Sequence, residues 1–227
     1  MIISKRIQTI AGHIAFADIA DIGTDHGHLP IFAIQSGLAT RAIAADINPG
    51  PLSHARRNAA SAGITDIDFR LGGGLDVLQP GEAGTIVISG MGGRLLADIL
   101  RAGRDVAASA GQLILSPHLD VPYLRRAVHG LGFNIFAEDM TEDDGKYYNI
   151  LDIRAGAPRE ADYGGREYLL GRHLLRTRPP AFLGYCRMMA ARYAKIADDI
   201  RKAAPLGSAG TAKLAETERL RDAHNEV

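Results

Sequence analysis

The stretch FADIADIGTDHGHLP, residues 16–30, decides the fold. Its apolar run Ile19–Ile22 stops at Gly23, a polar turn follows, and apolar residues return at helical spacing from Leu29 to Ile34. This pattern predicts a strand, a tight turn and a helix. In a doubly wound sheet the turn after the first strand lies beside the point where the strand order reverses, and ligands bind there.

This turn carries a carboxylate where dinucleotide-binding turns carry a glycine. The spacing Asp21-x-Gly23-x-x-x-Gly27 resembles the first motif of Rossmann-type methyltransferases, except that Asp25 replaces the middle glycine. A carboxylate at this point would repel a pyrophosphate, and it favours a ligand with positive groups, such as S-adenosylmethionine with its sulfonium and ammonium. The structural alternative is an ordinary strand–helix turn without a ligand.

Length and composition indicate one intracellular domain with an appendage. The chain has 227 residues, of which 46% are hydrophobic and 23% charged, as in ordinary globular proteins. Its 26 basic and 26 acidic residues cancel, so overall charge does not point to nucleic acid. Locally, however, residues 154–202 hold eleven Arg or Lys against five Asp or Glu.

Cysteine content and hydropathy predict a cytoplasmic location. The one cysteine, Cys186, excludes an intrachain disulfide and fits a reducing compartment. The sequence shows no signal-peptide pattern, and no uncharged apolar run approaches the roughly 18 residues that a membrane span needs. We therefore expect a soluble cytoplasmic chain with no membrane partner. The oligomeric state stays open, a monomer included.

Up to residue 154, strands and helices alternate. An amphipathic helix is expected at 2–14. The further predicted strands are 41–46, 66–71, 85–89 and 112–116, and the further helices are 49–62, 95–100 and 121–130. Residues 132–138 and 147–154 then form an antiparallel pair around the turn signal Asp144-Gly145. The expected fold class is α/β: a Rossmann-like class I methyltransferase sheet, mostly parallel, with a terminal antiparallel hairpin.

At residue 155 the composition shifts. Residues 155–165 are linker-like, and helices are expected at 168–176 and 181–203, separated by Pro179-Pro180. These two helices predict an antiparallel helical hairpin. A break at 205–210 and a polar, partly helical tail at 211–227 follow. The predicted domains are 1–154 and 155–227.

Three strand ends carry candidate cofactor contacts. Asp46 follows the second strand about 20 residues past the glycine turn, where a carboxylate accepts hydrogen bonds from an adenosine ribose. Three consecutive glycines, 72–74, let the backbone approach a planar ring, and the glycines of 90–93 leave a low floor for a substrate base. The structural alternatives are a helix cap, a flexible turn and close helix–sheet packing. The predicted cofactor residues are Asp21, Gly23, Thr24, Asp25, His26, Asp46, Ile47, Gly72, Gly73, Gly90, Met91 and Gly92.

Six strings follow one another in a specific order: DIGTDHGHLP, ADINPGPL, RLGGGLDV, ISGMGG, LILSPH and EDDGKYYNIL. In this order and spacing the chain resembles the bacterial tRNA (adenine-22-N1)-methyltransferase family. The resemblance implies a Rossmann-like domain with a helical C-terminal module, S-adenosylmethionine as cofactor and tRNA as substrate. It also implies that Asp21, Gly23, Asp25 and His26 form the cofactor turn, that Asp46 accepts the ribose, that Gly73 stands in the adenine loop, and that 90–93 lie at the methyl-transfer site.

Two positions depart from this family pattern. The family usually has Asn or Asp where this chain has Gly73, so the backbone or Asp76 would have to recognise the cofactor adenine. The family usually shows proline-asparagine where this chain has Pro117-His118. This second departure leaves the contact with the substrate base, and so the target nucleoside, open.

Asp25, His26 and His118 are the catalytic candidates. Asp25 could stabilise the positive charge that develops on a methylated adenine, or it could hold the cofactor ammonium. His26 fits a local hydrogen-bonding role better than that of a general base, whereas His118 lies at a strand end that faces the site. Tyr147 and Tyr148 could stack on a base. The sequence contains no metal-ligand spacing and no G-x-S-x-G motif, so we expect neither a metal nor a covalent nucleophile.

Basic residues of the C-terminal module are candidates for contacts with tRNA phosphates, with a solvated helix face as the alternative. They are Arg166, Arg172, Arg176, Arg178, Arg187 and Arg192. Two other functions stay open at this stage. One is a methyltransferase of the same fold that acts on a small molecule or a protein, and the other is a non-catalytic nucleoside- or RNA-binding protein.

Overall fold

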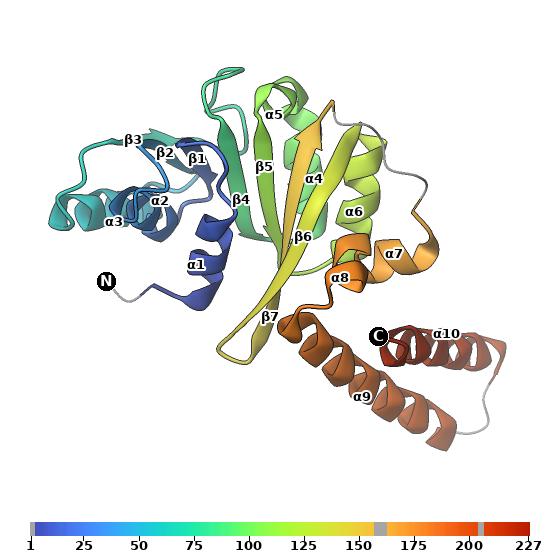
Figure 1. Cartoon of the computed structure of the whole chain (residues 1–227). Coiled ribbons are helices and arrows are strands. Elements are labelled where there is room, and N and C mark those ends of the chain that lie inside the picture. Colours follow the sequence, from blue (N-terminus) through green and yellow to red (C-terminus); the bar gives the residue numbers. More distant parts are fainter. Residues whose placement is uncertain (1–2, 157–162, 204–206) are drawn as a thin grey trace.

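A single sheet of seven strands organises the computed structural model, which describes residues 3–156, 163–203 and 207–227. The strand order is β3-β2-β1-β4-β5-β7-β6 (Figure 1). The strands are β1 (Asp18–Ile22), β2 (Arg41–Asp46), β3 (Ile67–Leu71), β4 (Thr85–Met91), β5 (Gln112–Pro117), β6 (Phe133–Asp143) and β7 (Lys146–Ala155). β1 to β5 are mutually parallel, and β7 is antiparallel to both β5 and β6. The predicted fold class is confirmed.

Helices cover both faces of this sheet. They are α1 (Lys5–Gly12), α2 (His28–Gln35) and α3 (Pro49–Ser61) on one face, and α4 (Gly93–Ala102), α5 (Arg104–Ser109) and α6 (Val121–Gly130) on the other. The alternation of side chains along β4 shows why: Ile86 and Ile88 pack with α4 and α6, whereas Val87 packs with α1 and α2. A strand that is buried on both faces explains the continuous apolar run of this segment.

The parallel pairing places the end of β1 at the centre of the sheet. Ile22 is in register with Ala45 of β2 on one side and with Ile88 of β4 on the other. The chain order therefore reverses beside β1, and the turn that follows residue 22 opens over this switch point. The location that the opening motif predicts for the site is the one that the topology creates.

Most predicted boundaries of the sheet region agree with the structure, but β6 continues to Asp143 instead of ending at residue 138, and two helices differ. The first helix is shorter than the expected 2–14, because it begins after the cap residue Ser4, whose side chain accepts a hydrogen bond from the amide of Ile7, and ends at Gly12. The six-residue α5 was not predicted, since so short a helix shows no apolar period in the sequence.

The first C-terminal helix was predicted wrongly as one segment, 168–176. The structure has two short helices, α7 (Gly165–Leu170) and α8 (Arg172–Thr177). Gly171 separates them with a φ of +94°, a backbone conformation that other residues rarely adopt. Of the predicted linker 155–165, residues 157–162 lie outside the described part of the chain.

The helical hairpin exists, but its second partner was predicted wrongly. The long α9 (Pro180–Lys202) forms the hairpin with α10 (Ser208–Asn225), while residues of 168–176 share a hydrophobic cluster with α9 but are not its hairpin partner (Figure 1). The expected polar tail is thus the second helix of the hairpin, and its Thr217 and His224 are buried. The sequence of α10 is polar because only a narrow stripe of this helix contacts α9. It therefore lacks the apolar period that would have predicted a packed helix. Ser208 to Gly210, in the predicted break, belong to α10, while residues 204–206 lie outside the described part.

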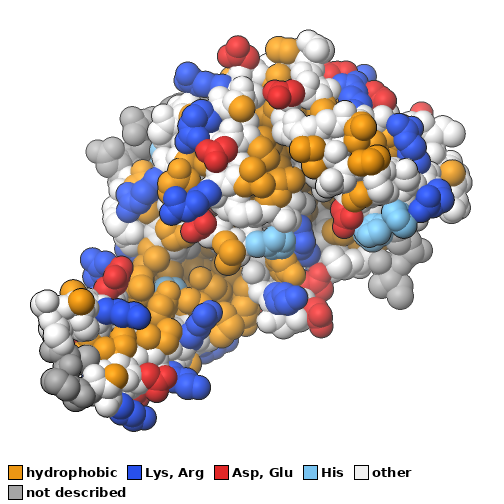
Figure 2. Space-filling model, turned by 180° about the vertical axis from the view of Figure 1, so that it is seen from behind, with side chains coloured by type: hydrophobic (Ala, Val, Ile, Leu, Met, Phe, Trp, Pro, Cys, Tyr) orange, Lys and Arg blue, Asp and Glu red, His pale blue; other side chains and the backbone are white. Residues whose placement is uncertain are grey.

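A separate hydrophobic cluster connects the hairpin to the sheet. Its buried members come from β6, α7, α8 and α9: Met140, Leu170, Leu174, Phe182 and Cys186. Figure 2 shows the hairpin at the lower left, with hydrophobic side chains on the side that faces the rest of the molecule and a hollow between the two. The domain boundary predicted after residue 154 stays a prediction, because this cluster includes residues from both sides of it.

One buried arginine joins the C-terminal module to the sheet. Arg125 of α6 donates to Glu138 of β6 over 2.6 Å, and both side chains are almost completely buried. Arg125 also donates to the carbonyls of Tyr168 and Leu169, at 3.1 and 3.0 Å, near the end of α7. A side chain at Gly171 would collide with this ion pair. The turn between α7 and α8 therefore depends on Arg125.

We expect the variant Arg125→Met to lose about 3–5 kcal/mol of unfolding free energy, because Glu138 would stay buried without its counter-charge. Urea denaturation of the full chain measures this loss. The control is Arg101→Ala, which removes a surface ion pair with Asp98 and should leave the unfolding midpoint nearly unchanged. A loss at Arg125→Met no larger than that of the control would contradict the assigned role.

Candidate active site

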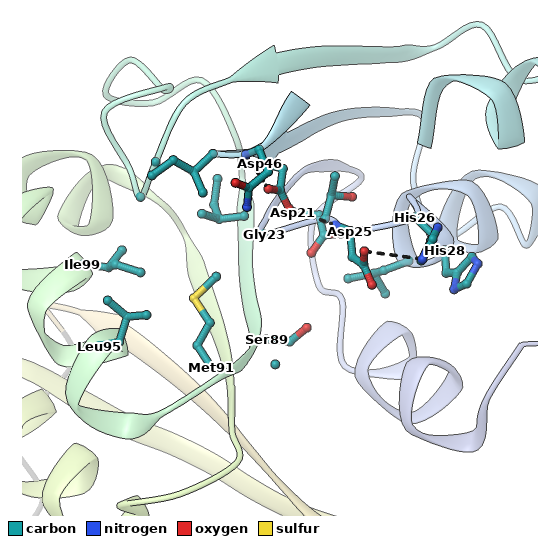
Figure 3. Close-up of a pocket in the computed structure, with 18 of the residues that line it drawn as sticks. Asp21, Gly23, Asp25, His26, His28, Asp46, Ser89, Met91, Leu95 and Ile99 are labelled. Carbon is teal, nitrogen blue, oxygen red and sulfur yellow. Dashed lines mark hydrogen bonds and ion pairs between the residues drawn. The ribbon is translucent and has the colours of Figure 1, made fainter. Parts of the chain in front are cut away.

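A cavity of about 580 Å³ opens at the carboxyl ends of β1, β2 and β4 (Figure 3). All predicted cofactor residues except Gly92 line it. Gly92 lies just beyond, as the residue before α4. The other lining residues are Ser4, Arg6, Ile7, Ile22, His28, Leu29, Asn48, Gly74, Ser89, Leu95, Ile99 and the catalytic candidate His118.

Backbone hydrogen bonds hold the turn after β1. The amides of Gly23 and Thr24 both donate to the carbonyl of Ala45 in β2, at 2.9 Å each. Gly23 has a φ of +77°, and a side chain there would overlap with the methyl group of Met91. The left-handed φ is what favours glycine here, because the Met91 methyl group ends a flexible side chain that could move aside.

Asp46 is held at the end of β2 by two backbone amides. Its Oδ1 accepts from the amide of Asn48 at 2.8 Å, and its Oδ2 accepts from the amide of Asp25 at 3.4 Å. The side chain is largely buried yet lines the cavity. A carboxylate with a fixed orientation and remaining lone pairs suits a pair of vicinal hydroxyls, which is the role expected of Asp46.

Three carboxylates surround the inner part of the cavity: Asp21, Asp25 and Asp46 (Figure 3). Burial raises the pKa of Asp21 to about 6, and the neighbouring carboxylates act in the same direction, while Arg6 opposes them. At pH 7 this group is therefore mainly ionised, and the inner cavity is negative. A ligand with positive charge is favoured there, and a pyrophosphate is not.

His26 in the turn contacts both Asp25 and His28, the first residue of α2. The His26 imidazole lies 3.6 Å from the carboxylate of Asp25 and is stacked on His28, with ring centroids 5.5 Å apart. Partial burial, followed by the proximity of His26, lowers the pKa of His28. His54 of α3 meets His26 edge-on. This arrangement gives His26 local partners, in keeping with a hydrogen-bonding role.

At the β4 end of the cavity, residues from three distant segments converge. His118, after β5, meets the ring of Tyr148 of β7, with centroids 5.8 Å apart, and the guanidinium of Arg6 lies 5.0 Å over the same ring. Gly90, with a φ of +81°, leaves space in front of both: a Cβ there would lie 3.3 Å from Arg6 and 3.7 Å from His118. Partial burial and the charges of Arg6 and Lys146 lower the pKa of His118, which is neutral at pH 7.

The two tyrosines lie in different places. Tyr148 lies beside the cavity, but Tyr147 packs against Tyr185 of α9, with centroids 5.8 Å apart. Arg6 is a site residue that sequence reasoning missed. No local signal could have found it, since it belongs to a helix far from Tyr148 in the sequence and meets it only through the fold.

Two absences hold for the part of the chain that the structure describes. No group of three or more His, Cys, Asp or Glu side chains there is arranged to hold a metal ion. None of its helices combines the length and the apolar character needed to cross a bilayer.

Comparison with known proteins identifies the family. A family model described as a methyltransferase domain matches residues 3–151. The tRNA (adenine(22)-N(1))-methyltransferase of Bacillus subtilis is 41% identical over 165 residues, which cover 72% of this chain and 69% of the relative. The chain belongs to this methyltransferase family. The resemblance stated from the six sequence strings is thereby confirmed.

Solved structures of this methyltransferase family agree over the whole chain. The crystal structure of the Bacillus subtilis tRNA methyltransferase TrmK has a TM-score of 0.85 at 33% identity, covering 99% of this chain and 98% of TrmK. A Streptococcus pneumoniae protein described as a candidate tRNA methyltransferase, solved with S-adenosyl-L-methionine, has a TM-score of 0.82 at 29% identity and 99% coverage of both chains. The C-terminal helices are thus part of the shared fold.

The residues around the cavity fit S-adenosylmethionine. Asp46 would hold the ribose hydroxyls, and Asp21 and Asp25 offer negative charge to the sulfonium and ammonium groups. Gly72 to Gly74 leave the adenine side open, with Ile47 close to Gly73. Residues 72–74 are glycines and have no side chain that could form a hydrogen bond with the adenine. This loop therefore offers only its backbone groups.

We expect Gly23→Ala to weaken binding of S-adenosylmethionine at least about tenfold, because alanine strains the left-handed turn and its methyl group displaces the Met91 side chain, which lines the cavity. Isothermal titration calorimetry measures the affinity. Gly37→Ala is the matched control: it has a φ of +70° and free space around it, away from the cavity.

Both variants should lose about 1–2 kcal/mol of unfolding free energy through backbone strain. Only Gly23→Ala should lose cofactor affinity. Equal affinities in the two variants would show that the turn does not position the ligand.

Proposed function

We infer that this chain transfers the methyl group of S-adenosylmethionine to N1 of an adenine in tRNA, at the position corresponding to adenine 22. The observation that carries the proposal is the 41% identity, over 165 residues, with the Bacillus subtilis enzyme of that activity. The negative inner cavity and the open floor at Gly90 support it. The two alternative functions, a methyltransferase that acts on a small molecule or a protein and a non-catalytic binding protein, are not favoured by membership of this family.

When bound, S-adenosylmethionine supplies an electrophilic methyl group on a sulfonium. Adenine N1 has an in-plane lone pair and needs no prior deprotonation, so the protein must mainly align the two reactants and exclude water. A bond from N1 to the methyl carbon forms as the bond from that carbon to sulfur breaks, and the positive charge passes to the adenine. Gly90 and Met91, at the end of β4, form the floor beside which this occurs.

Asp25 and His118 are the proposed polar residues of the transfer step. Asp25 faces the cavity beside Asp21 and can stabilise the positive charge of the methylated adenine. Neutral His118 can exchange a hydrogen bond with the base edge or its amino group, which is the role left open by the family's asparagine. His26, which contacts Asp25, is the proposed orienting residue for that carboxylate.

The C-terminal helices are the proposed site of tRNA backbone contact. Arg187 and Arg192 are exposed on α9, and Arg176 and Arg178 are exposed at the end of α8. The remaining two arginines already have protein partners. Arg166 lies 3.3 Å from Glu226, and Arg172 is partly buried against Glu167. We therefore assign phosphate contacts first to the exposed arginines of α8 and α9.

The first experiment measures methyl transfer from labelled S-adenosylmethionine to unmodified tRNA, with mass spectrometry of the nucleosides. We expect 1-methyladenosine at one position, and a loss of cofactor affinity of at least about tenfold in Asp46→Ala, which removes charge-assisted hydrogen bonds. Asp66→Ala is the control, because this exposed carboxylate precedes β3 at the amino ends of the parallel strands, away from the cavity.

Cofactor binding without a methylated tRNA product would contradict the proposed substrate. Activity in Asp46→Ala equal to that of Asp66→Ala would contradict the role of Asp46. The other candidate functions would then need to be tested directly.

A second experiment tests the arginines. Replacing Arg187 and Arg192 by Gln should weaken tRNA binding and lower the slope of log affinity against log salt by up to about one per arginine. The control Arg41→Gln lies at the opposite edge of the sheet, paired with Asp18. An unchanged slope in the double variant, with cofactor affinity intact, would place the tRNA contacts elsewhere.

A further inference from the structure

The proposed reaction imposes a requirement that the cavity alone does not meet. N1 lies on the pairing edge of adenine, so a paired and stacked base must leave its helix before this atom can reach a methyl group inside a cavity. Unstacking costs a few kcal/mol, and proteins commonly offset it by inserting an apolar side chain at the vacated position. Such a side chain must be exposed, rigidly held and placed just outside the cavity.

Leu119 has the first of these properties. Its exposed fraction is 70%, the largest among the exposed large hydrophobic residues that the structure describes. Two other apolar side chains near it in the fold are unusually exposed: Leu95 at 52% and Tyr123 at 37%. Leu119 and Tyr123 come from the β5–α6 connection and the start of α6, and Leu95 comes from the first turn of α4.

The turn that carries Leu119 is held on both sides. The amide of His118 donates to the carbonyl of Met91, and the amide of Gly93 donates to the carbonyl of Leu119, each at 2.9 Å. Asp120 adopts a φ of +56°, and Gly93 must be glycine because a Cβ would lie 2.7 Å from the Asp120 carbonyl. An exposed apolar side chain on so closely fastened a turn does not serve the packing of the core.

The position is next to the methyl-transfer end of the cavity. His118, the preceding residue, lines the cavity, as does Leu95, which points into it from α4 in Figure 3. The rim also carries positive charge: the guanidinium of Arg94 lies 4.5 Å over the Tyr123 ring and 3.5 Å from Asp120. Apolar side chains beside an exposed arginine suit nucleobases that are attached to phosphates.

We propose that Leu119 is the wedge that occupies the place of the target adenine in the tRNA stack, with Leu95 and Tyr123 supporting the neighbouring bases. This proposal rests on the proposed function, since it assumes an RNA base as substrate. Leu119 is then a positioning residue: it touches the flanking bases and favours the extruded conformation, without contacting the reacting atoms.

The test compares two substrates under single-turnover conditions with saturating S-adenosylmethionine. One is unmodified tRNA in which the target adenine is paired, and the other is the same tRNA with the opposing base changed so that it cannot pair. Leu119→Ala should react about tenfold more slowly with the first and within about twofold of the unaltered chain with the second. Leu119→Met, which keeps an apolar side chain of similar volume, should retain the rate on both.

The matched control is Leu38→Ala. Leu38 is also an exposed leucine, in the turn before β2 at the other edge of the sheet, and its replacement should change neither rate. Equal slowing of Leu119→Ala on both substrates, or no slowing on the paired one, would overturn the wedge.

A second readout needs no methyl transfer. A stem–loop RNA with 2-aminopurine at the target position should brighten when the full chain binds and unstacks that base, and brighten less with Leu119→Ala. Equal brightening with both proteins would overturn the wedge even if methylation proceeds. A different result would separate the two proposals. If the unaltered protein forms no 1-methyladenosine in tRNA, but still brightens 2-aminopurine more than Leu119→Ala does, the proposed product is overturned and the wedge is supported.

Discussion

Two backbone hydrogen bonds to one carbonyl determine the geometry of the site. Gly23 and Thr24 both donate to Ala45, which fastens the turn after β1 to the last residues of β2. The same contact brings the amide of Asp25 to the carboxylate of Asp46, so that three acidic side chains share one cavity. Since the φ of +77° at residue 23 favours glycine, this contact depends strongly on a single position of the sequence.

The cavity that results has two electrostatically different ends. Asp21, Asp25 and Asp46 make the β1–β2 end negative, while Arg6 and Lys146 lie near the imidazole of His118 at the other. A cationic cofactor and an RNA substrate have opposite charges. The negative end therefore favours the cofactor, and the end near His118 favours the RNA. The burial that raises the pKa of Asp21 also strengthens its interaction with a bound cation, because little water screens it.

Arg125 has a comparable role for the C-terminal module. Its buried guanidinium neutralises Glu138 and donates to the carbonyls at the end of α7, where the chain turns at Gly171. The orientation of α8, and through the cluster around Phe182 that of α9, follows from this contact. The exposed arginines of α9 are therefore held at a defined position relative to the cavity, which a flexible linker would not achieve.

The succession of strands along the chain, the glycine turn after β1 and the place of Asp46 at the end of β2 could be predicted from the sequence because each depends on local rules. A buried parallel strand appears in the sequence as an apolar run, a left-handed turn favours glycine, and the topology places Asp46 about 20 residues later.

The break at Gly171 and the pairing of α9 with α10 could not be predicted, because they depend on the Arg125 contact and on a narrow stripe of a polar helix. The same holds for Arg6 beside His118 and for the exposed Leu119, since only the packed sheet brings α1, β5 and β7 together. Local conformation is encoded in neighbouring residues, and the sequence by itself determined it; contacts between distant segments depend on how the whole chain packs, and only the tertiary structure decided them.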